Sequence, residues 1–266
     1  MPRLPVCIFV NLYGKGETNM SGHSKWSTIK RKKEKTDQQR AKVFTKIGRE
    51  LAMAVKAGGP DPDNNAKLRD VIAKAKSNNV PNDNIERIIK KAAGGDDNSE
   101  YEEIVYEGYG PSGVAVIVET LTDNRNRTAA DLRHYFDKCG GNLGQPGSVM
   151  FQFQRQGLIA VEAEGRDEDA VMEAALEAGA EDFNSDGDVY SIVTDPNQMG
   201  AVRDGIEKAG YPYLSAEVAY VPSVTVDITD PEMAEKMEKL IDLLEENDDV
   251  QEVWHNWNMP EEPEED

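Results

Sequence analysis

The stretch TDQQRAKVFTKIGRELAMAVK, residues 36–56, has the apolar spacing of an amphipathic helix. At 100° per residue its apolar side chains fall within one arc of about 120°, and they are Val43, Phe44, Ile47, Leu51, Ala54 and Val55. On the opposite side lie the cations Lys42, Lys46, Arg49 and Lys56. One face can therefore pack in a core while the other presents a row of positive charge.

Two further helices are expected downstream, over residues 64–77 and 81–93. Gly58-Gly59-Pro60 ends the first helix, and Gly94-Gly95 ends the third. Each segment repeats apolar residues at helical spacing, with Lys and Arg beside them. Three short amphipathic helices predict a small basic bundle.

The charge of the chain reverses after this bundle. Residues 20–93 contain 18 Lys/Arg and 8 Asp/Glu, whereas residues 94–266 contain 10 and 41. A basic module within a chain of net charge −20 indicates a nucleic-acid or other polyanion partner for that module. No apolar run approaches the ~20 residues of a membrane span, and the two cysteines give no disulfide framework. We expect a cytoplasmic protein without membrane contact.

Residues 21–35 are basic and poor in apolar side chains, so we expect them to stay flexible until a polyanion neutralises them. Trp26 offers a stacking surface for a base or an anchor into the bundle. The predicted nucleic-acid-binding residues of the module are Lys25, Trp26, Lys30, Arg31, Lys32, Lys33, Lys35, Lys42, Lys46 and Arg49. A merely solvated basic face is the alternative interpretation.

Arg125 and Arg127 lie in a strand-to-helix turn, residues 122–128. They are predicted as a second phosphate contact, aided by the helix N-terminus. A capped turn with exposed arginines explains the same residues. Both interpretations stay open at this stage.

The acidic body alternates strand-like and helical runs. A hairpin, residues 101–121, leads into a helix that Thr122-Asp123 is expected to cap and that runs to about residue 138. Strands are expected at 149–153, 158–163, 180–184, 189–193, 216–221, 224–228 and 250–254, and helices at 167–178, 196–209 and 231–246. The order β-α-β-β-α-β over 158–221 is that of a ferredoxin-like unit.

Two strand-to-helix turns have the same sequence pattern, Thr194-Asp195-Pro196 and Thr229-Asp230-Pro231. Asp suits the N-cap of a helix and Pro its first position. Both turns are therefore predicted to begin helices.

The predicted fold class is α+β, with an N-terminal three-helix basic domain followed by two α+β (ferredoxin-like) domains, one inserted in the other. The expected limits are an extension outside the fold (1–19, ahead of a start at Met20), the basic helical domain (20–96), a discontinuous α+β domain (97–154 with 223–258), the inserted domain (155–222) and an acidic disordered tail (259–266).

Some segments resemble chemical sites without meeting their requirements. Asp182-x-Asn184-x-Asp186-Gly187 matches the start of a calcium loop, but the twelfth position is Val193 where a bidentate Glu is needed. The glycine-rich loop 140–147 leaves a helix and contains no Lys, unlike a phosphate loop. The three histidines have no ligand spacing. We predict no catalytic, metal or cofactor residue, and hence a protein that is not an enzyme.

Four segments together resemble the YebC/PmpR family, namely Gly22-His23-Ser24-Lys25-Trp26, Lys42-Val43-Phe44-Thr45-Lys46, residues 122–128 and Gly140-Gly141-Asn142-Leu143-Gly144. The resemblance covers Met20 to about Asn258, and the family is related to a mitochondrial translational activator of cytochrome c oxidase. It implies a cytoplasmic, non-enzymatic protein with a helical domain and two α+β domains.

Family members are described as DNA-binding transcription regulators, and others as translation factors at the ribosome. The resemblance therefore leaves DNA and rRNA open as partners, with the ribosome as a possible larger partner. The competing class is an enzyme or protein-interaction module that uses the acidic body. In that case the basic domain is only a solvated face.

Overall fold

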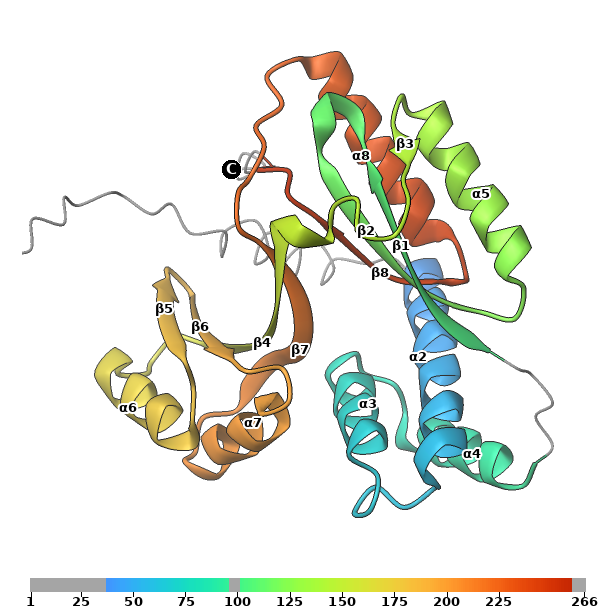
Figure 1. Ribbon diagram of the computed structural model, residues 1–266. Coiled ribbons are helices and arrows are strands. Elements are labelled where there is room, and N and C mark those ends of the chain that lie inside the picture. The colour runs from blue at the N-terminus through green and yellow to red at the C-terminus, as the bar shows by residue number, and fades with distance from the viewer. Residues whose placement is uncertain (1–36, 96–100, 260–266) are drawn as a thin grey trace, which may run out of the picture.

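In the computed structural model, residues 37–95 and 101–259 are described, and the predictions for 1–36 and 260–266 lie outside them. Three helices come first, and two antiparallel sheets with their helices follow (Figure 1). The predicted α+β fold class is confirmed. No helix in the described ranges has the length and apolarity needed to cross a bilayer.

Among the described residues, the helical domain has three helices, α2 (Asp37–Gly58), α3 (Ala66–Ser77) and α4 (Asn82–Ala93). Its core is built from the apolar faces that the helical period predicts, with Leu51 and Leu68 fully buried. Asn65 caps α3 by accepting the Leu68 N–H at 3.0 Å. The same side chain donates to the Ala54 carbonyl at 2.8 Å, which fixes the loop to α2.

The first sheet has the strand order β3-β1-β2-β8, with β3 (Asn142–Leu143), β1 (Glu102–Tyr109), β2 (Ala115–Thr122) and β8 (Val250–His255). A short 3-10 turn, η1 (Pro111–Gly113), joins β1 to β2. Helices α5 (Arg125–Lys138) and α8 (Pro231–Glu246) pack on one face. Strand β2 pairs with β8 although the second sheet lies between them in sequence (Figure 1). This pairing supports the proposed insertion of residues 155–222.

The second sheet has the order β5-β6-β4-β7 and antiparallel neighbours. Its elements are β4 (Phe153–Glu162), α6 (Glu168–Ala178), β5 (Asp182–Asp186), β6 (Val189–Thr194), α7 (Met199–Lys208) and β7 (Tyr213–Pro222). Val171 of α6 and Ile206 of α7 are both fully buried in one cluster with Ile159 and Val161 of β4. Both helices therefore cover the same face, as the ferredoxin-like order requires.

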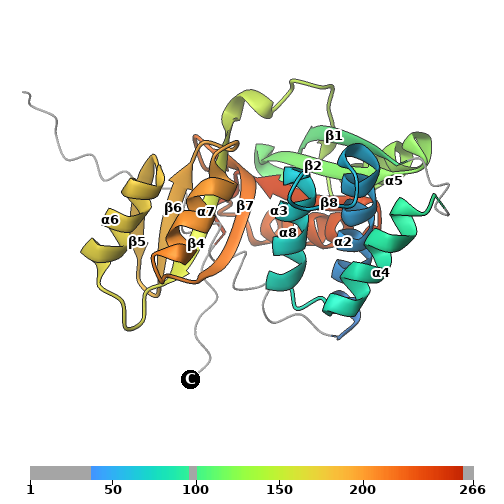
Figure 2. The ribbon, with the colours of Figure 1, turned by 90° about the horizontal axis from the view of Figure 1, so that it is seen from below.

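The two sheets share an apolar cluster, because alternate side chains of β2 meet different layers. Val116 faces α5 and α8, whereas Ile117 packs with Phe153 and Ala219 of the second sheet. The buried cluster of the helical domain, by contrast, contains described residues of 43–92 only. Figure 2 shows this domain beside the two sheets, with α3 next to β7.

Two expected strands are wrong. In the expected strand 149–153, Met150–Gln152 form a 3-10 turn, η2, and only Phe153 belongs to a strand, as the first residue of β4. The reason is that the Glu107 carboxylate accepts the Val149 and Met150 N–H groups, both at 2.8 Å, so these donors cannot join a ladder. In the expected strand 224–228, only Val226 forms a bridge, with Trp257.

The expected helix caps are partly wrong as well. Asp230 caps α8 with Pro231 in the first turn, as predicted. Asp195 instead accepts the Asn197 N–H at 2.8 Å in a turn, and α7 begins only at Met199. The cap of α5 is Asn124, whose side chain accepts the Arg127 N–H at 3.1 Å.

Candidate nucleic-acid interface

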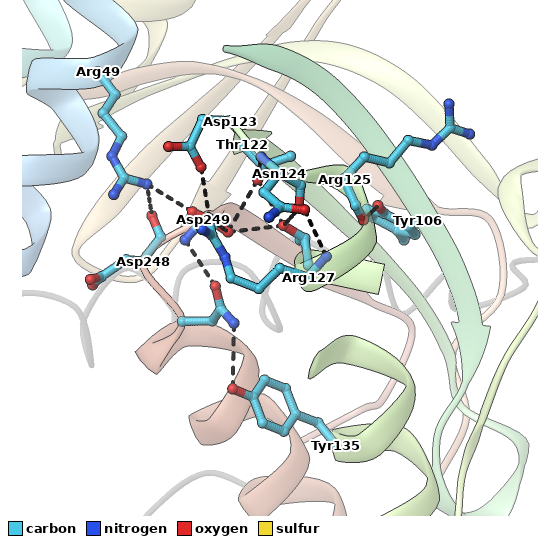
Figure 3. A network of polar contacts seen from close by, with 12 residues as sticks. Arg49, Tyr106, Thr122, Asp123, Asn124, Arg125, Arg127, Tyr135, Asp248 and Asp249 are labelled. Atoms are coloured by element: carbon cyan, nitrogen blue, oxygen red, sulfur yellow. Dashed lines mark hydrogen bonds and ion pairs between the residues drawn. The ribbon is translucent and has the colours of Figure 1, made fainter. Parts of the chain in front are cut away.

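Seven predicted binding residues lie outside the described residues, namely Lys25, Trp26, Lys30, Arg31, Lys32, Lys33 and Lys35. The other five are on two helices, with Lys42, Lys46 and Arg49 on α2 and with Arg125 and Arg127 on α5. The structure brings Arg49 and Arg127 together, whereas the guanidinium of Arg125 points elsewhere (Figure 3).

The cationic face of α2 lies against the C-terminal end of α8. Lys46 Nζ donates to the Glu245 carbonyl oxygen at 2.8 Å. Lys42 Nζ, one turn earlier, donates to the Glu246 carbonyl oxygen at 3.3 Å. The row of cations predicted from the sequence therefore has an intramolecular partner, which the sequence did not reveal.

The end of α8 attracts cations for two reasons. The carbonyl groups of a last helical turn have no partner within the helix, and they form the negative end of the helix dipole. The last turn of α8 contains no basic residue, and the acidic residues Glu245, Glu246, Asp248 and Asp249 add negative charge there. Helix α2 therefore supplies the positive charge that α8 lacks.

Asp249, which directly precedes β8, connects α2 to α5 (Figure 3). Arg49 Nη1 donates to its Oδ1 at 3.1 Å, and Arg127 Nη2 donates to its Oδ2 at 2.7 Å. The Thr128 hydroxyl donates to the same Oδ2 at 2.9 Å. The Asp249 side chain is only 7% exposed, and its carboxylate is shared between two helices.

The electrostatics of Asp249 follow from these contacts. Burial alone would raise the pKa of the Asp249 carboxyl group. The hydrogen bonds from Arg127 and Thr128 outweigh that effect, and they hold the pKa below its ordinary value. The carboxylate is therefore ionised at neutral pH and pairs with both arginines.

The two arginines of the 122–128 turn differ. Arg127 also donates to Asp123 at 2.9 Å, so two carboxylates share its guanidinium, although its side chain is 47% exposed. Arg125 is exposed, and its guanidinium points away from the network (Figure 3). Its backbone carbonyl accepts the Tyr106 hydroxyl at 3.4 Å. Arg125 is thus the better placed of the two for an external phosphate.

Several exposed cations of α3 and α4 are not among the predicted binding residues, namely Arg69, Lys76, Arg87, Lys90 and Lys91. On α4 they alternate with an apolar face in which Ile85 and Ala92 are buried. The amphipathic spacing of residues 85–92 could have identified the three cations of α4, because the positions between the apolar residues are mostly Lys or Arg. They extend the positive surface beyond α2.

The glycine-rich loop binds the Glu107 side chain of the same protein. Glu107 is buried, and its Oε1 accepts the Gly147 N–H at 2.6 Å. The other carboxylate oxygen, Oε2, accepts the N–H groups of Val149 and Met150. Three backbone N–H groups that could otherwise bind an external anion are therefore paired with the Glu107 carboxylate. This arrangement holds the loop against β1.

The calcium-like segment forms β5 and a hairpin turn, in which Gly187 has φ 56°. Within 37–95 and 101–259, no three His, Cys, Asp or Glu side chains are grouped as a metal site.

Known proteins are similar to this chain over both its helical domain and its two sheets. Residues 24–95 match the TACO1/YebC protein N-terminal domain, and residues 101–257 match the TACO1/YebC second and third domain. A relative from Acetivibrio thermocellus, named "Probable transcriptional regulatory protein", is 58% identical over 239 residues, which is 90% of this chain and 99% of the relative. One of the same name from Caldicellulosiruptor saccharolyticus is 58% identical over 243 residues, 91% of this chain and 100% of the relative.

A solved structure is also similar. The crystal structure of a conserved hypothetical protein from Aquifex aeolicus matches with a TM-score of 0.76 and 46% identity, over 87% of this chain and 96% of that protein. The family matches together cover both the helical domain and the two sheets. The chain therefore belongs to the TACO1/YebC family.

Proposed function

We propose that this chain is a non-enzymatic regulatory factor of gene expression that binds nucleic acid through its basic helical domain. The names of its relatives support a regulatory role. The observation that carries the proposal is the separation of charge along the chain, since 18 Lys/Arg lie within residues 20–93 and 41 Asp/Glu follow them. An acidic body repels a polyanion and confines its contact to the basic end.

The type of cation indicates the type of contact. The exposed side chains of Arg69, Lys90 and Lys91 suit phosphates, because long flexible cations neutralise a backbone and release its counterions. Phosphate contacts position a protein but carry no sequence information. We therefore propose weak sequence selectivity. DNA, in transcription, and rRNA on the ribosome, in translation, both offer this chemistry in the cytoplasm.

The direct test is binding of the full chain to labelled RNA and duplex DNA over a range of salt concentrations. The variant Arg87→Gln/Lys90→Gln/Lys91→Gln should bind more weakly, and its logarithmic salt slope should shrink by about 0.7–0.9 for each lost phosphate contact. The control Arg133→Gln/Lys138→Gln/Lys239→Gln removes the same charge from exposed positions of α5 and α8. Equal losses of affinity for nucleic acid in the two variants would refute a specific role for the helical domain.

A second experiment separates the two targets. Crosslinking in cells, followed by sequencing of the bound nucleic acid, should recover rRNA if the factor acts in translation. Part of the protein should then sediment with ribosomal subunits at low salt and leave them at high salt. A promoter-specific regulator should instead prefer one DNA sequence by at least ~10³-fold over competitor DNA. That preference would contradict the weak selectivity proposed here.

A further inference from the structure

Three of the cations predicted to bind nucleic acid, Lys42, Lys46 and Arg49, hold the helical domain against the acidic body. We propose that the acidic end of α8 and the start of β8 act as an intramolecular substitute for a nucleic-acid backbone, which keeps the helical domain closed until a polyanion displaces it. This inference rests on the proposed function, because it requires that these cations bind a polyanion.

The first support is the polar nature of the junction. The buried apolar cluster of α2–α4 contains no residue of the two sheets, among the residues that the structure describes. The sheets, by contrast, share the cluster that includes Ile117 and Ala219. The hydrophobic effect therefore joins the two α+β domains to each other, whereas polar contacts hold the helical domain to them.

The second support is the direction of these contacts. In addition to the α2 contacts described above, Lys67 pairs with Glu103, and Lys74 Nζ lies 3.2 Å from a Glu252 carboxylate oxygen. In each case the helical domain provides the cation and the body provides the anion. In one pair the charges are reversed, because Asp70 of α3 provides the anion and Arg203 of α7 provides the cation.

The third support is the chemistry of the acceptors. Lys42, Lys46 and Arg49 lie about one turn apart on α2, and each donates to an oxygen of residues 245–249. A row of oxygens with full or partial negative charge thus faces a row of cations. A phosphodiester backbone offers the same partners. The Arg49 side chain is only 21% exposed. Its guanidinium must therefore separate from Asp249 before all of its N–H donors can contact an external phosphate.

The contacts are suited to exchange. Ion pairs between partly exposed side chains contribute little individually, and salt weakens them. A polyanion that presents several phosphates can replace several of them at once. Its apparent affinity is lowered by the fraction of molecules that is closed, so opening the junction should tighten binding.

The test opens the junction without changing any cation. Glu103→Gln/Glu252→Gln removes the carboxylates of the acidic body that pair with Lys67 and Lys74. The pair between Lys74 and Glu50 of α2, at 2.8 Å, lies within the helical domain and is kept. The control Glu173→Gln/Glu177→Gln makes the same charge change at exposed positions of α6. Binding of a labelled single-stranded oligouridine to the full chains is measured by fluorescence anisotropy. We expect the opened variant to bind at least about threefold more tightly than the control, a change within the range that weak ion pairs can produce.

A second measurement uses the unmodified chain. A carbodiimide joins the Lys67 amine to the Glu103 carboxylate only while the two are paired, and mass spectrometry quantifies the linked peptide. Adding oligouridine at constant ionic strength should lower its yield. Normal binding with an unchanged yield and equal affinities of the two variants would overturn this inference and leave the proposed function standing. The absence of binding at every salt concentration would overturn both.

Discussion

Arg203 of α7 donates through Nη1 to Asp70 of α3 at 3.1 Å, although 133 residues separate them. The Arg203 side chain is 4% exposed, and Asp204 accepts from its Nε and Nη2 at 3.0 and 2.9 Å. One buried guanidinium thus links α7 to α3 through the partly exposed carboxylate of Asp70, while the carboxylate of Asp204, on α7 itself, holds the guanidinium in place.

Removing the two carboxylates should cost more than removing the arginine. Asp70→Asn/Asp204→Asn leaves a buried guanidinium without ionic partners and should destabilise the protein by about 3 kcal/mol. Arg203→Met leaves two carboxylates that water can reach, so its cost should be smaller. Urea denaturation of both variants measures the difference. The reverse order would show that Arg203 acts mainly through packing of its stem.

The variant Lys42→Ala/Lys46→Ala/Arg49→Ala should leave the helical bundle folded, because Ala suits a helix and these residues lie outside the apolar cluster. It should loosen the last turn of α8 and lower the free energy of unfolding by about 1–3 kcal/mol, since cations at a helix C-terminus contribute about 0.3–1 kcal/mol each. Hydrogen exchange in residues 241–250 reports the loosening. The control is Arg87→Ala/Lys90→Ala/Lys91→Ala, which should leave that exchange unchanged.

Asp249 predicts an acid-sensitive contribution to stability. Its pKa is lower in the folded protein, so its stabilising effect is present above the ordinary Asp pKa of about 3.9 and is lost as the pH falls through the folded-state value. Asp249→Asn should therefore lower the free energy of unfolding by about 2 kcal/mol at neutral pH. The difference in unfolding free energy between the variant and the unchanged chain should become smaller in acid. Denaturation of both chains from neutral pH into acid measures this difference in the free energy of unfolding.

Glu107→Gln tests the support of the glycine-rich loop. The amide that replaces the carboxylate brings N–H donors toward the backbone N–H groups of Gly147, Val149 and Met150. We expect a loss of about 1–3 kcal/mol, the cost of unsatisfied buried donors, and faster amide exchange in residues 144–150. Glu102→Gln, at an exposed position of the same strand, is the matched control. Similar exchange in the two variants would disprove the anchoring role of Glu107.

A fragment of residues 20–93 should fold by itself, because its apolar cluster lies within its own helices, and its excess of Lys and Arg should then bind nucleic acid. A fragment of residues 98–266 should not bind nucleic acid, since Asp and Glu far outnumber Lys and Arg in it. Gel-shift titrations of the two fragments at several salt concentrations compare them directly. Equal affinity from the acidic fragment would contradict the charge argument.

Local periodicity predicted the buried faces well. Leu51 and Leu68 are buried where the 3.6-residue spacing places them, and the order of elements over 158–221 yields the observed second sheet. These features depend on neighbours in sequence, or on alternation along one strand. They can therefore be read from a single chain.

Contacts between distant segments could not be predicted in this way. Arg49 and Asp249 are 200 residues apart, and nothing in the pattern around either residue indicates the other. The basic face of α2 is visible in the sequence, but its partner is a set of backbone carbonyls, which every residue possesses. Similarly, Glu107 lies on β1, and its carboxylate accepts the N–H groups of Val149 and Met150 in the expected strand 149–153. The sequence around 149–153 does not indicate this distant acceptor.

The pairing of β2 with β8 has a consequence for synthesis on the ribosome. At roughly 5–20 residues per second, the segment between Thr122 and Val250 takes about 6–25 s to appear. The helical bundle depends on local contacts and can fold during that interval. Until Glu245 and its neighbours emerge, the Lys42–Lys46–Arg49 face lacks the oxygen atoms of residues 245–249 that it contacts in the complete fold. Each newly made molecule therefore passes through a period in which its cations are uncovered before the chain is complete.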